Sequence, residues 1–202
     1  MKAPTLKDVI LARNRIRPYL LKTPFHTYPT LNEHLGCEAY VKHENHHPTG
    51  AFKIRGGINL ISQLPEQEKE RGVVTASTGN HGQSIALASK IFGVKAIVCV
   101  QDGANPTKVA GIRSFGAEIV EHGRDFDDAR LNAERLAEEH GYRYIHSGNE
   151  PLLIAGVGTM ALEMIEDQPD LDYVFSPVGA GTNCAGVGLV YKALCPETKV
   201  VA

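Results

Sequence analysis

Residues 48–57 read Pro-Thr-Gly-Ala-Phe-Lys-Ile-Arg-Gly-Gly, which places a lysine between an aromatic and a branched aliphatic residue with glycines on both sides. A lysine on an exposed helix face, the default interpretation of any single lysine, does not need these neighbours. An amine in an apolar pocket has a lowered pKa and becomes a nucleophile that forms Schiff bases. Lys53 is therefore a candidate reactive amine, and the small residues around it leave room for a large, flat ligand.

On both sides of this stretch, segments typical of strands alternate with segments typical of helices. Strands are predicted at residues 39–43, 73–76, 95–100, 118–120, 142–145, 173–175 and 199–202. Helices are predicted from a cap at Thr5 to Ile16 and at residues 51–64, 80–92, 106–115, 126–140, 151–165 and 182–194. This alternation indicates parallel βαβ units with helices on both sheet faces. The last strand lacks a following helix, so we expect the natural protein to be longer.

Composition excludes several classes of protein. The chain has 202 residues, enough for one or two domains, and a net charge of −2 with scattered lysines and arginines rather than a basic face for nucleic acid. The longest apolar runs, such as residues 96–100, are too short to span a bilayer, and no leader opens the chain. The four cysteines form no Cys-x-x-Cys pair, which favours reduced thiols. We therefore expect a cytoplasmic protein with no nucleic-acid or membrane partner.

Two further strand-to-helix loops are rich in small and polar residues, and ligands in open α/β sheets bind at such loops. Residues 77–82 read Ser-Thr-Gly-Asn-His-Gly and supply hydroxyls, an amide and backbone N–H groups that suit a carboxylate. A helix cap would need only one such residue. Residues 179–183 read Gly-Ala-Gly-Thr-Asn and suit a phosphate, although a tight turn for helix–strand packing explains them equally well. A reactive lysine, a phosphate loop and a carboxylate loop together indicate pyridoxal phosphate and an amino-acid substrate.

With these motifs in this order, the sequence resembles the fold-type II pyridoxal-phosphate enzymes, in the branch of serine/threonine dehydratases (ammonia-lyases) and serine racemases. The resemblance covers essentially the whole chain and rests on Lys42-x-Glu44 before residues 48–56, on residues 77–83 and on residues 177–182. It implies an α/β, open parallel-sheet, two-domain fold like that of the tryptophan synthase β subunit, apparently truncated at the C-terminus. The implied large cofactor-binding domain is formed by residues 1–70 and 143–202, and the small domain by residues 71–142.

The resemblance also implies residue roles. Lys53 would form the Schiff base with pyridoxal phosphate and later move the α-proton, while Phe52 would flank the ring and Asn80 would bind its hydroxyl. The loop for the substrate carboxylate would be lined by Ser77, Thr78, Gly79 and His81. The loop for the phosphate would be formed by Gly179, Ala180, Gly181 and Thr182.

Two positions depart from the family pattern. Residues 179–182 replace a run of four glycines, so Ala180 and Thr182 must tolerate the backbone shape of that loop. Thr78 stands where racemases carry a serine that acts as acid and base, and where dehydratases tend to have alanine. A threonine hydroxyl can serve that purpose, but its methyl group restricts its rotamers. Thr78, a second candidate catalytic residue, therefore leaves racemisation open.

The resemblance implies a dehydratase that converts a 3-hydroxy amino acid, such as L-threonine or L-serine, into a 2-oxo acid and ammonia by β-elimination. Alternatives are a serine racemase, a 3-hydroxyaspartate dehydratase, or a cofactor-binding fragment without activity. A homodimer is also implied. His43, His46 and His47 lack further metal ligands at suitable spacing beyond Glu44, so no metal is predicted within the chain. The family's partner for the pyridine nitrogen and its divalent-metal site would lie beyond residue 202.

Overall fold

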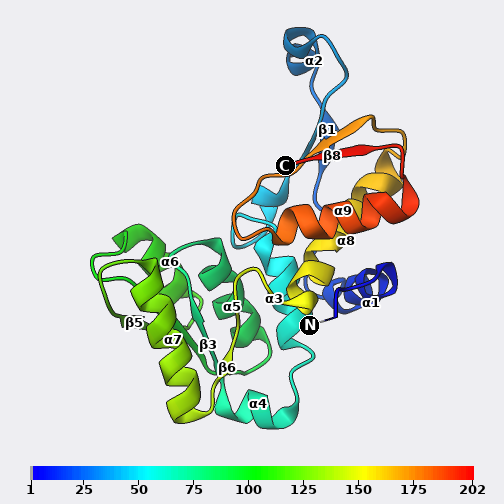
Figure 1. The fold of residues 1–202 in the computed structure, drawn as a ribbon. Helices are drawn as coiled ribbons and strands as arrows, with labels where there is room; N and C mark the ends of the chain where they lie inside the picture. Colours follow the sequence, from blue (N-terminus) through cyan, green and yellow to red (C-terminus); the bar gives the residue numbers. More distant parts are fainter. Residues whose placement is uncertain (1) are drawn as a thin grey trace.

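The computed structural model describes residues 2–202, and a four-stranded parallel sheet forms the centre of one lobe (Figure 1). The strands lie in the order β5-β4-β3-β6. Their bounds are β3 (Val73–Ala76), β4 (Ala96–Val100), β5 (Glu118–Glu121) and β6 (Arg143–Tyr144). Every residue of β3 and β4 is buried, as expected for central parallel strands that are covered on both faces.

Three helices cover this sheet: α5 (Asn80–Ile91), α6 (Pro106–Ser114) and α7 (Phe126–His140). Val74 and Ile97 pack with Ala129 of α7 on one face. Val73 and Val98 belong to a larger core that includes Ile85 of α5 and residues of α6, so they point to the other face. The alternation of side chains along each strand therefore separates two apolar layers.

The other lobe is built mainly from helices α1 (Leu6–Ile16), α8 (Pro151–Asp167) and α9 (Thr182–Leu194) (Figure 1). Two short parallel strands, β7 (Tyr173–Phe175) and β8 (Lys199–Val201), lie beside them. An antiparallel pair, β1 (Phe25–Thr27) and β2 (Tyr40–Lys42), extends from this lobe and carries helix α2 (Pro29–Leu35) at its tip. Within residues 2–202, no helix combines the length and apolar character of a membrane span.

Helix α3 (Lys53–Ile61) lies between the two lobes and contacts both α5 and α8. Glycines allow these close approaches. A Cβ atom on Gly57 would lie 2.4 Å from Ser84 Oγ of α5, and one on Gly156 of α8 would lie 2.6 Å from Arg55 O. The glycines that follow Lys53 in the sequence therefore serve helix packing.

Each predicted helix and strand is present, and the predicted α/β fold with a parallel sheet is confirmed. Thr5 caps α1 in a capping box with Asp8, in agreement with the predicted cap. Four short elements were not predicted: β1, α2, the 3₁₀ turn η1 (Glu44–His46) and α4 (Glu66–Arg71). The division into a large and a small domain stays a prediction.

A buried ion-pair network fixes the start of α3. Arg55 is 1% exposed, and its Nε and Nη2 donate to the two oxygens of Glu44 at 2.7 and 2.8 Å. Its Nη1 and Nη2 also donate to the two oxygens of Glu163 in α8, again at 2.7 and 2.8 Å. Lys42 of β2 joins the network, with Nζ 2.7 Å from Glu163 Oε2. One guanidinium therefore ties α3 to the turn η1 and to α8.

Burial opposes the charge on each carboxylate of this network, and hydrogen bonds outweigh burial. Burial alone would raise the pKa of Glu44, but the contact with His47, hydrogen bonds from Arg55 and Thr23 and the charge of Arg55 hold that pKa well below its usual value. Hydrogen bonds from Arg55 and Lys42 likewise lower the pKa of Glu163. Both carboxylates are therefore ionised in the folded chain near neutral pH.

We predict that Glu44→Gln lowers the free energy of unfolding at pH 7 by about 1.5–3 kcal/mol, the range for hydrogen bonds that involve a charged group. The pKa of Glu44 is lower in the folded than in the unfolded chain, so its contribution is present above the unfolded value of 4.5 and is lost as the pH falls below it. The difference in the free energy of unfolding between wild type and variant should therefore narrow below pH 4.5. Urea unfolding at several pH values between about 3 and 8 measures this difference.

Glu139→Gln is the matched control. Glu139 pairs with Arg135 at 2.5 Å on the surface of α7, where its side chain is 48% exposed. Exposed pairs contribute about 0–1 kcal/mol, so this variant should differ little from wild type at any pH. A difference in the free energy of unfolding between wild type and Glu44→Gln that stays constant across the pH range would contradict the ionised state of Glu44.

Candidate active site

The amine of Lys53 lies between residues from three separate segments. Lys53 is the first residue of α3, and its Nζ donates to Thr182 Oγ1 of α9 at 2.6 Å. The carbonyl oxygen of Ser147 is 3.5 Å away, and the centroid of the Phe52 ring is 5.5 Å away. Burial lowers the pKa of Lys53, and no carboxylate within residues 2–202 pairs with it. This environment makes Lys53 a better nucleophile than an exposed lysine.

The loop before α9 borders open space. Gly181 has a φ of +84°, a left-handed conformation that favours glycine, and a Cβ on Gly179 or Gly181 would meet nothing within 4 Å. The first N–H groups of a helix have no partner within the helix, and they attract anions. The positions of Thr182 and Lys53 therefore bring a reactive amine next to a helix start that suits a phosphate.

A second such helix start follows β3. The predicted loop runs through Ser77 to Gly79, and Asn80 begins α5. Ser77 is buried and its Oγ accepts from the N–H of Gly79 at 3.1 Å, but no side chain caps α5. Thr78 and Gly79 are half-buried and Asn80 is exposed. The absence of a cap within this part of the chain favours a ligand loop over the alternative, an ordinary helix cap.

His81 is buried, and its surroundings define its tautomer and its protonation state. Its Nε2 lies 3.0 Å from Thr75 Oγ1, and that hydroxyl donates to Ile145 O at 2.7 Å. Because Thr75 has already donated its proton, its oxygen accepts from the Nε2–H of His81. Burial, followed by the charge of Lys53, lowers the pKa of His81 to about 3. His81 is therefore neutral near pH 7, and its ring bonds the sheet.

Some of the predicted site residues contact each other directly in the structure, and others do not. Lys53 contacts Thr182, and Ser84 Oγ of α5 donates to Lys53 O at 2.7 Å, which holds the loop before α5 beside α3. No hydrogen bond joins Thr78 or Asn80 to Lys53 among the described residues.

Sequence reasoning missed the loop after β6. Ser147 O faces the Lys53 amine, and a Cβ on Gly148 would lie 2.3 Å from Ala180 O. This loop packs against the loop before α9 and thereby positions it. The small and polar residues Ser147-Gly148-Asn149 follow a predicted strand, so the rule that found the other loops could have found this one.

The histidines before the lysine loop differ in their surroundings. His47 is buried with Nε2 3.3 Å from Glu44 Oε2, while His46 is exposed. Within residues 2–202, no group of three or more histidine, cysteine, aspartate or glutamate side chains is arranged to hold a metal ion. The His47 ring therefore lies against a carboxylate of the network around Arg55.

The residues present fit pyridoxal phosphate. A desolvated amine suits the aldehyde, and the uncapped starts of α5 and α9, together with the open space at Gly179 and Gly181, suit anionic groups.

Two known proteins with similar sequences are named ammonia-lyases. The chain is 41% identical to the L-threonine ammonia-lyase of Thermotoga maritima over 98% of its own length and 49% of that protein. It is 40% identical to the L-threo-3-hydroxyaspartate ammonia-lyase of Saccharomyces cerevisiae over 99% of its length and 61% of that protein. The chain therefore spans about half to three-fifths of these relatives.

Solved structures of other proteins share the fold of this chain. The crystal structure of serine racemase from Dictyostelium discoideum matches with a TM-score of 0.91 and 41% identity, over 98% of this chain and 64% of that one. A family model described as pyridoxal-phosphate dependent enzyme matches residues 16–202. The chain belongs to the family of pyridoxal-phosphate dependent enzymes.

Proposed function

We propose that this chain carries the lysine-bearing part of a pyridoxal-phosphate dependent dehydratase (ammonia-lyase). Its substrate would be a 3-hydroxy amino acid such as L-threonine or L-serine, and its products a 2-oxo acid and ammonia. The observation that carries the proposal is the contact of the desolvated Lys53 amine with Thr182 at the start of α9. The names of relatives at 40–41% identity support the substrate class.

Each predicted residue has a proposed role. Lys53 Nζ would hold pyridoxal phosphate through the cofactor's aldehyde and would take the α-proton of the substrate. Bound pyridoxal phosphate would withdraw electrons from the α-carbon and so make that proton acidic. Phe52 would flank the cofactor ring, and Asn80 would bind the hydroxyl of that ring. The phosphate would be held by Gly179, Ala180, Gly181 and Thr182.

The loop before α5 is the proposed site for the substrate carboxylate, lined by Ser77, Thr78, Gly79 and His81. Its half-buried residues and the uncapped start of α5 offer backbone N–H groups to an anion. The neutral ring of His81 is already bonded to Thr75, so His81 contributes backbone rather than charge. Thr78 supplies a hydroxyl that is free to act in proton transfer.

Two alternative activities follow from the names of relatives. The yeast relative is named for L-threo-3-hydroxyaspartate, and the Dictyostelium relative is a serine racemase that is 41% identical over 100% of this chain. A cofactor-binding fragment without activity is the non-enzyme alternative, and the Lys53 contact with Thr182 and the loop before α5 argue against it.

We also propose a cytoplasmic homodimer without nucleic-acid or membrane partners. The four cysteines are free thiols in the structure, which supports a reducing compartment. The homodimer rests on the family resemblance, and light scattering of the purified chain tests it.

We predict that Lys53→Ala abolishes both the covalent link to pyridoxal phosphate and turnover. Borohydride reduction followed by peptide mass spectrometry should place a pyridoxyl group on Lys53 in the wild-type chain and on no residue in the variant. Lys90→Ala, which removes an exposed lysine of α5, is the control and should label as wild type does. Labelling of another lysine in wild type would contradict the assignment.

Thr182→Val should weaken the binding of pyridoxal phosphate about tenfold to a hundredfold, because a buried hydroxyl that bonds a charged group contributes about 1.5–3 kcal/mol. Thr182→Ser keeps the hydroxyl and should bind the cofactor nearly as wild type does. Titration followed by the absorption of the bound cofactor gives both affinities. Equal affinity of the valine variant and wild type would remove Thr182 from the proposed site.

The substrate is identified by assay of the chain loaded with pyridoxal phosphate. L-Threonine, L-serine and L-threo-3-hydroxyaspartate are supplied separately, and 2-oxo acid, ammonia and the D-enantiomer of serine are measured. We expect 2-oxo acid and ammonia in equal amounts from L-threonine or L-serine. D-Serine as the main product would indicate a racemase, and cofactor binding without any product would indicate the inactive fragment.

A further inference from the structure

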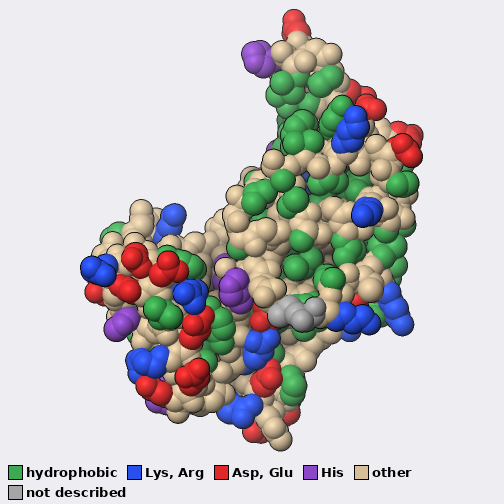
Figure 2. Space-filling view, viewed as in Figure 1, with side chains coloured by type: hydrophobic (Ala, Val, Ile, Leu, Met, Phe, Trp, Pro, Cys, Tyr) green, Lys and Arg blue, Asp and Glu red, His purple; other side chains and the backbone are tan. Residues whose placement is uncertain are grey.

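Residues 145–150 lead from β6 in the sheet lobe to α8 in the other lobe (Figure 1). In the space-filling view the outline of the molecule is hollowed between these two lobes (Figure 2). β6 lies on one side of β3, whereas β4, which follows β3 in the chain, lies on the other side. Ligands in open α/β sheets bind at the carboxyl ends of strands where the strand order reverses in this way. The segment after β6, which begins with Ile145 and His146, therefore borders the expected ligand site.

The ring of His146 accepts two hydrogen bonds from its own segment. Its Nδ1 accepts from the N–H of Gly148 at 3.0 Å and from the N–H of Asn149 at 2.9 Å. A ring nitrogen accepts only when it carries no proton, so the ring proton of His146 lies on Nε2. The ring also packs edge-to-face on Tyr144, with the two centroids 6.4 Å apart. The side chain of His146 thus holds the backbone of the segment in one bent conformation.

This bent segment contacts two parts of the site. Ser147 O lies 3.5 Å from Lys53 Nζ. A Cβ on Gly148 would lie 2.3 Å from Ala180 O, so the backbone of Gly148 lies directly against the loop before α9. Because the bonds to His146 determine the course of this backbone, their loss would displace both contacts together.

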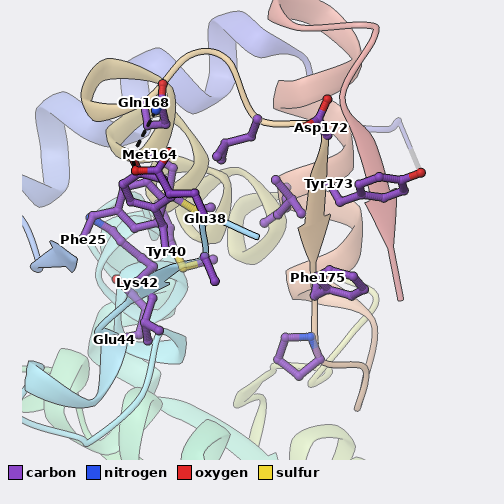
Figure 3. Close-up of a pocket in the computed structure, with 18 of the residues that line it drawn as sticks. Phe25, Glu38, Tyr40, Lys42, Glu44, Met164, Gln168, Asp172, Tyr173 and Phe175 are labelled. Atoms are coloured by element: carbon purple, nitrogen blue, oxygen red, sulfur yellow. Dashed lines mark hydrogen bonds between the residues drawn. The ribbon is translucent and has the colours of Figure 1, made fainter. Parts of the chain in front are cut away.

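A cavity of about 890 Å³ lies between β2 and β7, with Lys42 on one side and Phe175 on the other (Figure 3). Phe52 lines this cavity, but none of residues 146–149 does. A substitution of His146 therefore acts on the surroundings of Lys53 without replacing any residue in the wall of this cavity.

We propose that His146 is a positioning residue of the site. Its neutral ring holds Ser147 against the amine of Lys53 and holds Gly148 against the loop for the phosphate. The identity of the ligand rests on the proposed function, but the contacts that carry the inference belong to the chain itself. His146 acts on the site through these two neighbours.

A neutral acceptor suits this position better than a charged one. Asparagine and aspartate also accept from backbone N–H groups two residues further on. An aspartate, however, would favour the protonated amine of Lys53 and would repel a phosphate. Position 146 is within electrostatic reach of the site, because the pKa of His81 is lowered by burial, then by the charge of Lys53, and also by that of His146. The carboxylate of Glu150 is bound by Arg143 Nη2 at 2.8 and 3.0 Å.

Three substitutions separate hydrogen bonding from charge. His146→Asn keeps a neutral acceptor, His146→Asp keeps the acceptor and adds a charge, and His146→Ala removes the acceptor. Each chain is acetylated with limiting acetic anhydride at several pH values, without any cofactor. Peptide mass spectrometry then gives the pH at which labelling of Lys53 is half-maximal.

This labelling midpoint should be the same in His146→Asn as in wild type and should shift to higher pH in the other two variants. In His146→Asp the added charge favours the protonated amine. In His146→Ala the segment moves and water reaches the amine, so the burial that lowers the pKa of Lys53 is reduced. Amide hydrogen exchange at Gly148 and Asn149 should become about tenfold faster in His146→Ala alone.

Two aldehydes test the contact with the loop for the phosphate. The affinity for pyridoxal phosphate should fall about tenfold in His146→Ala, and the affinity for pyridoxal, which lacks the phosphate, should fall much less. His146→Asn should keep both affinities. His122→Ala is the matched control and should behave as wild type does, because His122 is an exposed histidine that follows β5 as His146 follows β6.

The role of His146 would be overturned by wild-type labelling midpoints in both His146→Ala and His146→Asp, by failure of His146→Asn to behave as wild type does, or by equal effects of His122→Ala. Urea unfolding identifies a variant that does not fold. If His146→Ala is unfolded, the comparison of His146→Asp with His146→Asn decides, since both keep the acceptor and differ in charge. A wild-type chain that binds no pyridoxal phosphate would count against the proposed function, whereas labelling and exchange would still decide the role of His146.

Discussion

The buried guanidinium of Arg55 is the constraint on which the arrangement of the site depends. It binds both oxygens of Glu44 and both oxygens of Glu163, and so it fixes how α3 is rotated about its axis. Lys53 lies two residues earlier, about 200° around the helix, so the same rotation directs its side chain toward Thr182. The buried, ion-paired guanidinium of Arg55 thus orients the amine of Lys53, whose protonated form is disfavoured by burial.

Close helix packing adds a second constraint. Gly57 admits Ser84 of α5 and Gly156 admits the backbone of Arg55, so α3 is held between helices from the two lobes. Loops that follow β3, β6 and β7 then reach the end of α3 at which Lys53 lies. The site therefore gathers residues that are up to 129 positions apart in sequence, as for Lys53 and Thr182.

Most of the fold was predictable because parallel strands and their helices leave strong local patterns. Continuous apolar runs marked β3 and β4, and Pro106 and Gly141 marked helix boundaries. The antiparallel strand β1 left no such pattern, since its three residues include a polar histidine and a threonine that are exposed. In the site, residue types predicted Lys53 and the loops around it. The contact with Ser147 and the network around Arg55 depend on distant segments, so residue type alone did not reveal them.

The close contacts at Gly57 and Gly156 have a consequence for the mutations that the chain can tolerate. A side chain of even one carbon at either position would overlap atoms of the neighbouring helix, so α3 would have to move. Lys53 would move with it. An alanine in α8 would therefore change the position of an amine that belongs to another helix.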